Sequence, residues 1–197
     1  MNLIRKISNK FFDQLADLLV QFPRIMFYRS LSNIKLNMNN INQPVLSSGK
    51  GIVAIGRNVK FGVKPSPGYY SNYTYLNARR PESKIIIGDN NFFNNNLAII
   101  SDGKTIRIGN NCLFGLNVEI TDSDFHDLSI DNRFGGKNVI KKDVVIGNNV
   151  FIGNNVVILR GVSIGDNCVV GNSSLVVKDI PENSIAAGNP CKVIRTL

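Results

Sequence analysis

The stretch IGNNVFIGNNVVILRGVSIGDNCVVGNSSLVV, residues 146–177, decides the fold of this chain. Its six repeat-starting residues stand six positions apart without a gap, and Gly follows four of them: Ile146, Ile152, Ile158, Ile164, Val170 and Val176. The fifth position of each unit is also apolar or small. Neither the 3.6-residue period of a helix nor the two-residue period of a strand produces this spacing. The pattern predicts a solenoid whose chain turns a corner every six residues.

The same register extends back toward residue 85. It returns earlier in the chain at two sets of three positions, Ile87, Phe93 and Ile99, and then Ile108, Phe114 and Ile120. We expect positions one and five of each unit to point inward and three units to close one coil of a triangular prism. Gly-Asn-Asn and Gly-Asp-Asn segments suit the corners, because Gly and Asn adopt left-handed backbone angles at low cost. The fold class is therefore an all-β solenoid.

Two interruptions break the repeat. A small excursion occupies residues 101–107, and residues 121–145, TDSDFHDLSIDNRFGGKNVIKKDVV, form a long loop thrown out of the solenoid. Long loops in compact domains are usually functional. This one carries His126, the only histidine of the chain.

The N-terminal part has a different character. Residues 1–30 have apolar residues at helical spacing, and Pro23 marks the expected end of this amphipathic helix. It could pack on its own domain or on a neighbouring subunit. The other interpretation is peripheral contact with a membrane, because Arg and Lys residues surround the apolar stripe. Residues 31–197 form the β-helix domain, and the tyrosines of its irregular start, residues 31–84, either pack a lid or line a sugar site.

Composition narrows the function classes. The chain has 197 residues, a net charge of +9 and 43% hydrophobic residues, which fits one globular domain. No apolar run is long enough to span a membrane, and no nucleic-acid-binding motif accompanies the basic charge. Cys112, Cys168 and Cys191 follow no disulfide or metal spacing, so we expect reduced, packed thiols. The absence of a signal peptide predicts a cytoplasmic protein, and a location at the inner face of the membrane is the alternative.

The hexapeptide units, the extruded loop with its histidine and the ending IPENSIAAGNPCKVIR, residues 180–195, resemble the hexapeptide-repeat acetyltransferases. The similarity covers about residues 85–197 and is greatest to the galactoside, maltose and polysaccharide O-acetyltransferase branch. It implies a left-handed parallel β-helix and a homotrimer. It also implies that acetyl-CoA, the acyl donor, lies in a groove between neighbouring solenoids.

The resemblance also implies roles for individual residues. His126 matches the catalytic base, Asn94 an acceptor contact, and Phe151 a position beside the active site. The residues that match the donor site, along the pantetheine arm and the nucleotide phosphates, are Asn154, Asn172, Val177, Lys178, Lys192 and Arg195. Sugar-acetylating relatives have Gly before the histidine, whereas this chain has Phe125. That version looks more like the polysaccharide and lipopolysaccharide O-acetyltransferases.

The residues themselves suit acyl transfer from a thioester. Histidine titrates near neutral pH, so His126 could deprotonate an acceptor hydroxyl for direct attack on the acetyl group, and Asp124 or Asp122 could orient the imidazole. We therefore expect an O-acetyltransferase that acts on a bacterial surface polysaccharide or its precursor. N-acetylation of an amino sugar or antibiotic remains an alternative, as does a non-catalytic scaffold. One histidine is too few for a zinc carbonic anhydrase of this fold, so no metal is expected.

Overall fold

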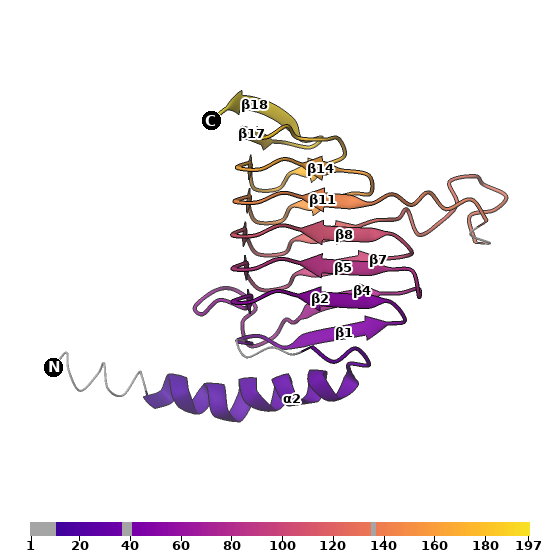
Figure 1. The fold of residues 1–197 in the computed structure, drawn as a ribbon. Helices are drawn as coiled ribbons and strands as arrows, with labels where there is room; N and C mark the ends of the chain where they lie inside the picture. The colour runs from indigo at the N-terminus through magenta and orange to yellow at the C-terminus, as the bar shows by residue number, and fades with distance from the viewer. Residues whose placement is uncertain (1–10, 37–40, 135–136) are drawn as a thin grey trace.

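Residues 11–36, 41–134 and 137–197 are described by a computed structural model, shown in Figure 1. Short parallel strands stack into three sheets that form the three sides of a prism. The six-stranded sheet runs, in order, β1 (Val45–Gly49), β4 (Thr74–Ala78), β7 (Ala98–Ser101), β10 (Glu119–Thr121), β13 (Val157–Ile158) and β16 (Leu175–Val176). The five-stranded sheet contains β2 (Ile52–Ile55), β5 (Lys84–Ile87), β8 (Thr105–Ile108), β11 (Val144–Ile146) and β14 (Ser163–Ile164).

The third side is a seven-stranded sheet, closed at its C-terminal end by an antiparallel pair. It contains β3 (Lys60–Phe61), β6 (Phe92–Phe93), β9 (Leu113–Phe114), β12 (Phe151–Ile152), β15 (Val169–Val170), β17 (Ser184–Ala187) and β18 (Lys192–Thr196). The chain visits the five-, seven- and six-stranded sheets in turn, so each coil contributes one strand to each side. The solenoid begins at β1, so strands β1 to β4 of the irregular region already form its first coils.

The register confirms the predicted repeat. Phe151 pairs with Val169 and Val157 with Leu175, an offset of 18 residues, which is three hexapeptides per coil. Hydrogen bonds that span the extruded loop join residues 38 apart, so the loop adds length without disturbing the stack. The predicted inward positions are confirmed: repeat-starting Ile152 is 0% exposed and fifth-position Val156 is also 0% exposed. These columns form one continuous apolar core.

The corners hold the coils in register through a ladder of side chains. At one corner, the backbone N–H of Asn110 donates to Oδ1 of Asn148 at 2.9 Å, and the backbone N–H of Asn148 donates to Oδ1 of Asp166 at 2.7 Å. The next residue, Asn149, adopts a φ of 55°, which Asn tolerates. A Cβ on Gly147 would lie 2.2 Å from Oδ1 of Asp166, so the ladder requires glycine there. This explains the Gly-Asn-Asn repeat.

The N-terminal helix is continuous over residues 11–31 and lies across the end of the prism (Figure 1). It contains a π-helical turn, η1 (Asp17–Gln21), followed by α2 (Phe22–Leu31). The prediction that Pro23 ends the helix is wrong. Pro23 is the second residue of α2, which directly follows the π-helical turn. A backbone N–H is not needed at this position, so proline is tolerated there. The first ten residues of the predicted helix lie outside the described part of the chain.

Tyrosines of the irregular region contact this helix. Tyr73 lies 4.6 Å from Tyr28 of α2 between ring centroids, and Tyr69 is 9% exposed. Within the described residues, no helix is long and apolar enough to cross a membrane.

Candidate functional site

The extruded loop leaves the prism where the chain passes from the six-stranded to the five-stranded sheet, which we name the loop corner. A short antiparallel contact fixes its root, since Ser123 bridges Lys141 and the amide of Asp124 donates to the carbonyl of Ile140 at 3.1 Å. The loop then projects well beyond the stack (Figure 1). The prediction of a long excursion after β10 is confirmed, with β11 resuming at Val144.

Asp122 forms the buried floor of the loop root. Its carboxylate is 0% exposed and accepts hydrogen bonds from the Ser101 hydroxyl at 2.7 Å, the Asp102 amide at 2.7 Å and the Lys104 amide at 2.9 Å. All three donors belong to the preceding coil, and the only ring hydrogen bond of His126 among the described residues goes to Arg133. Asp122 therefore fastens the loop to the preceding coil and does not orient His126.

Asp124 is held by a cation from the next coil. Nε of Arg160 donates to Oδ1 of Asp124 at 2.6 Å, and the two side chains are 24% and 19% exposed. Oδ2 of Asp124 is buried and has no hydrogen-bond partner among the described residues. The structure thus pairs Asp124 with Arg160, and the orienting contact with His126 that the sequence suggested is not formed in the single chain.

His126 stands exposed on a constrained segment of backbone. Phe125 before it adopts a φ of 58°, a left-handed angle that is uncommon for an aromatic residue, and its ring lies 4.6 Å from the guanidinium of Arg79. Nδ1 of His126 lies 3.3 Å from the carbonyl oxygen of Arg133. Because a carbonyl can only accept, Nδ1 carries the proton in this contact, and the neutral ring keeps its lone pair on Nε2.

Two further carboxylates stabilise the loop. Burial opposes ionisation of Asp102, but hydrogen bonds from Lys141 and Arg80 prevail and lower its pKa. Lys141 lies on the returning arm of the loop, 2.8 Å from Asp102, so this ion pair ties that arm to the prism. Within the loop, backbone N–H donors of Ser129 and Asn138 lower the pKa of Asp127. The loop is anchored at its root and braced internally.

The residues expected to contact the acceptor and the pantetheine arm lie at a different corner, between the seven- and six-stranded sheets. Asn94 is half-buried, and its side chain accepts from the Asn95 amide. Oδ1 of Asn154 accepts from the Leu116 amide, and Oδ1 of Asn172 accepts from the Asn154 amide, so these side chains belong to a corner ladder. The single chain does not bring this corner together with His126.

The remaining expected site residues lie on the outer surface. Phe151 is 47% exposed on the seven-stranded face. Val177 and Lys178 are exposed at the loop corner of the last coil, while Lys192 and Arg195 are exposed on β18 at the C-terminal end of the prism. Among the described residues these three cations make no ion pair, so they are available to anionic groups.

Other nucleophiles and metal sites are not supported in the described ranges. The three cysteines are free and buried, and burial raises the pKa of each thiol, which disfavours a reactive thiolate. No group of His, Cys, Asp and Glu side chains in these residues could hold a metal ion.

Sequence reasoning missed Arg160 and Arg79. A signal existed for the first, because the unit that begins at Ile158 reads ILRGVS and replaces the usual Gly-Asn corner with Leu-Arg. The exception stands one coil beyond the loop root, where a cation can reach the loop. No sequence signal pairs Arg79 with Phe125.

Comparison with known proteins identifies the family. Residues 143–178 match the family described as bacterial transferase hexapeptide (six repeats), and residues 105–121 match the hexapeptide repeat of succinyl-transferase. A galactoside O-acetyltransferase of Lactococcus lactis is 37% identical over 166 residues, which cover 83% of this chain and 73% of that protein. The chain belongs to the hexapeptide-repeat acetyltransferases.

Other members of this acetyltransferase family extend the match. A galactoside O-acetyltransferase of Escherichia coli is 46% identical over 115 residues, 58% of this chain and 55% of that one. A solved structure described as galactoside acetyltransferase in complex with coenzyme A has a TM-score of 0.52 at 35% identity, covering 73% of this chain and 64% of the other. The chain folds as a left-handed parallel β-helix. The chain spans only about half the length of the E. coli relative.

Proposed function

We propose that the protein is an acetyl-CoA-dependent O-acetyltransferase whose acceptor is a sugar hydroxyl of a surface polysaccharide or its precursor. The observation that carries the proposal is His126, exposed on an anchored loop with Nδ1 directed at a backbone carbonyl and Nε2 left as an acceptor. Relatives of the chain support an O-acetyltransferase, since they include galactoside O-acetyltransferases and a polysialic acid O-acetyltransferase of Escherichia coli.

The reaction needs one base and no covalent enzyme intermediate. Nε2 of His126 accepts the proton of the acceptor hydroxyl as its oxygen attacks the thioester carbonyl. The C–S bond then breaks, the acetyl ester forms, and the departing sulfur takes the proton back from the imidazolium. The carbonyl of Arg133 would hold the ring in the required tautomer throughout.

We further propose that the site is completed between copies in a homotrimer. The corner that carries Asn94, Asn154 and Asn172 is separated from the loop within one chain, which supports a site built from two chains. The loop tip favours the same arrangement, because Ile130 is 84% and Phe134 99% exposed, and a neighbouring copy would cover them.

In this proposal the donor lies along the same intersubunit groove. Asn154, Asn172 and Val177 would line the pantetheine arm, and Phe151 would flank the acetyl group. Lys178, Lys192 and Arg195 would contact the phosphates of coenzyme A, which the absence of competing ion pairs in the described chain supports.

The test is release of coenzyme A from acetyl-CoA against a panel of glycans, nucleotide sugars and amino sugars, with the product bond identified by NMR. His126→Ala should lower kcat by about 10²–10⁴, the usual loss for a general base. Asp131→Asn, an exposed change in the same loop, is the matched control and should keep kcat. Acetylation of an amine in preference to a hydroxyl, or an active His126→Ala enzyme, would contradict the proposal.

A further inference from the structure

The N-terminal helix, residues 11–31, directs polar groups toward the solenoid. Gln21 is 2% exposed, and its Nε2 donates to the carbonyls of Asn42 at 2.7 Å and Tyr69 at 2.9 Å. Arg24 donates to Oε1 of Gln21 at 2.6 Å. A helix that packs on a domain usually buries its apolar stripe. Here polar side chains make much of the intramolecular contact, beside the ring contact of Tyr28 with Tyr73.

The acidic residues of the helix are turned the same way. The described helix has two carboxylates, Asp13 and Asp17, and both lie within ion-pair distance of Lys64 on the solenoid, at 3.7 and 3.0 Å. The Tyr70 hydroxyl also donates to Asp17 at 2.9 Å. The carboxylates of the described helix are therefore paired with a cation of the prism.

The helix also carries a stripe of exposed apolar side chains. Its side chains recur at helical spacing, are between 36% and 64% exposed, and form what we name the apolar face: Phe11, Leu15, Leu18, Leu19, Phe22 and Met26. Single exposed apolar residues are ordinary, but a continuous stripe along one helix marks an interaction surface. The helix that carries this face lies at the N-terminal end of the stack (Figure 1).

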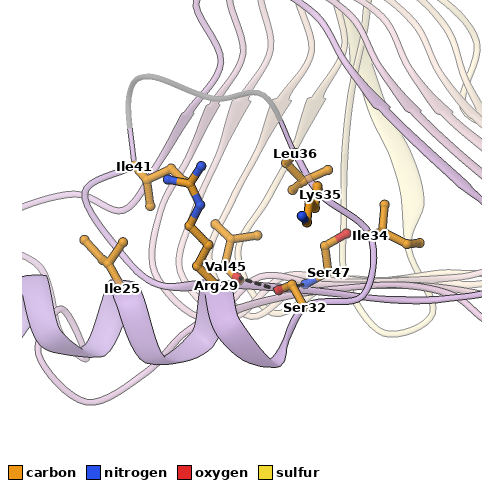
Figure 2. Close-up of a pocket in the computed structure, with 9 residues that line it drawn as sticks. All are labelled: Ile25, Arg29, Ser32, Ile34, Lys35, Leu36, Ile41, Val45 and Ser47. Atoms are coloured by element: carbon orange, nitrogen blue, oxygen red, sulfur yellow. Dashed lines mark hydrogen bonds between the residues drawn. The ribbon is translucent and has the colours of Figure 1, made fainter.

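Cations flank this face. Arg29 lies one turn beyond Met26, and both Arg29 and Lys35 are exposed. Both side chains line a cavity of about 180 Å³ near the C-terminal end of α2 (Figure 2). The ten residues before the described helix contain Arg5, Lys6 and Lys10 and no acidic residue. The charge pattern therefore complements an anionic surface.

We propose that the helix docks on the surface of an anionic phospholipid bilayer, with the apolar face at the boundary between headgroups and acyl chains and with Arg29 and Lys35 against lipid phosphates. The helix lies across the prism end, so it can lie flat in the bilayer plane while the coils rise away from it (Figure 1). A second copy fits less well, because a self-contact of this face would bring like cations together while both carboxylates of the described helix are already paired with Lys64.

The test uses the full chain without acetyl-CoA and measures co-sedimentation with vesicles of phosphatidylcholine containing about one third phosphatidylglycerol. We expect binding that weakens on pure phosphatidylcholine and in high salt. The double variant Leu18→Ser/Leu19→Ser removes side chains that are 62% and 64% exposed, so it should keep the fold and lower the partition coefficient at least about tenfold. Ile194→Ser, equally exposed at 64% on β18 at the other end of the prism, is the matched control and should bind as wild type.

A second variant guards against a folding artefact. Arg29→Glu/Lys35→Glu leaves the apolar face intact and should also weaken binding to anionic vesicles. Failure of the wild-type chain to bind, or unchanged binding of Leu18→Ser/Leu19→Ser, would overturn the proposal. So would a wild-type chain that ignores vesicles while the serine variant changes the mass measured by light scattering, because the face would then belong to a second copy. None of these readouts depends on acetyl transfer, so they are separate from the test of His126.

Discussion

Replacing Arg160 by Met should loosen the loop that carries His126 while leaving the prism folded. Arg160 belongs to the coil after the loop and donates to Asp124 at 2.6 Å, and Asp124 in turn accepts the His126 amide through its own carbonyl at 2.7 Å. Met keeps most of the aliphatic packing of Arg and removes the charge. The variant therefore isolates the ion pair.

The magnitude follows from how buried the pair is. Stripping one partner from a fully buried pair costs about 3–5 kcal/mol, whereas an exposed pair contributes about 0–1 kcal/mol. These side chains are 24% and 19% exposed, and Oδ2 of Asp124 has no other described partner, so an intermediate cost of about 2 kcal/mol is expected. By the relation of about 1.4 kcal/mol per factor of ten, the open-loop population rises about 30-fold.

Hydrogen exchange followed by mass spectrometry measures that population directly. The amides of Asp124 and Lys142 are bonded across the loop root, so a peptide that contains either should exchange about 30-fold faster in Arg160→Met, with a fall in kcat alongside. Arg107→Met, an exposed arginine on the outer side of β8, is the matched control.

The double variant Arg160→Met/Asp124→Leu removes both charges and should restore much of the protection, because no unpaired carboxylate remains. Exchange within about threefold of wild type in Arg160→Met, or a double variant that exchanges faster than the single one, would refute the role of the ion pair.

Other expected outcomes follow from the same structure. Because its folded pKa is lowered, Asp102 contributes stability above its ordinary pKa of about 3.9 that disappears as pH falls through the folded value, so the Tm difference between wild type and Asp102→Asn should shrink toward zero in acid. Lys192→Ala/Arg195→Ala should raise the KM for acetyl-CoA far more than it lowers kcat, and an unchanged KM would remove the phosphate assignment. Ile152→Ala, at a fully buried column position, should lower the free energy of unfolding by about 2–5 kcal/mol in urea titrations, whereas a loss under 1 kcal/mol would contradict the core assignment. Light scattering should give the mass of a trimer at micromolar concentration, and a monomer would contradict the shared site.

The sequence by itself determined the coil. A six-residue spacing of Ile and Val leaves one way to bury every repeat, and residues such as Ile146 and Ile158 are buried as that spacing required. The same reasoning located the loop, because an interruption in a strict repeat must leave the stack. It also singled out His126, the one histidine of the chain, as the candidate base.

Tertiary structure decided the different partners of the two carboxylates at the loop root. Asp122 and Asp124 stand two residues apart, yet Asp122 accepts hydrogen bonds from the preceding coil and Asp124 accepts one from Arg160 of the following coil. Such partners lie about one coil away in space but 20 and 36 residues away in sequence, so local spacing carries no trace of them. The helix shows the same limit. The sequence showed the helical spacing of its apolar residues. It did not show which side of the helix faces the solenoid, because that side is set by contacts with Lys64 and with backbone carbonyls far away in the sequence.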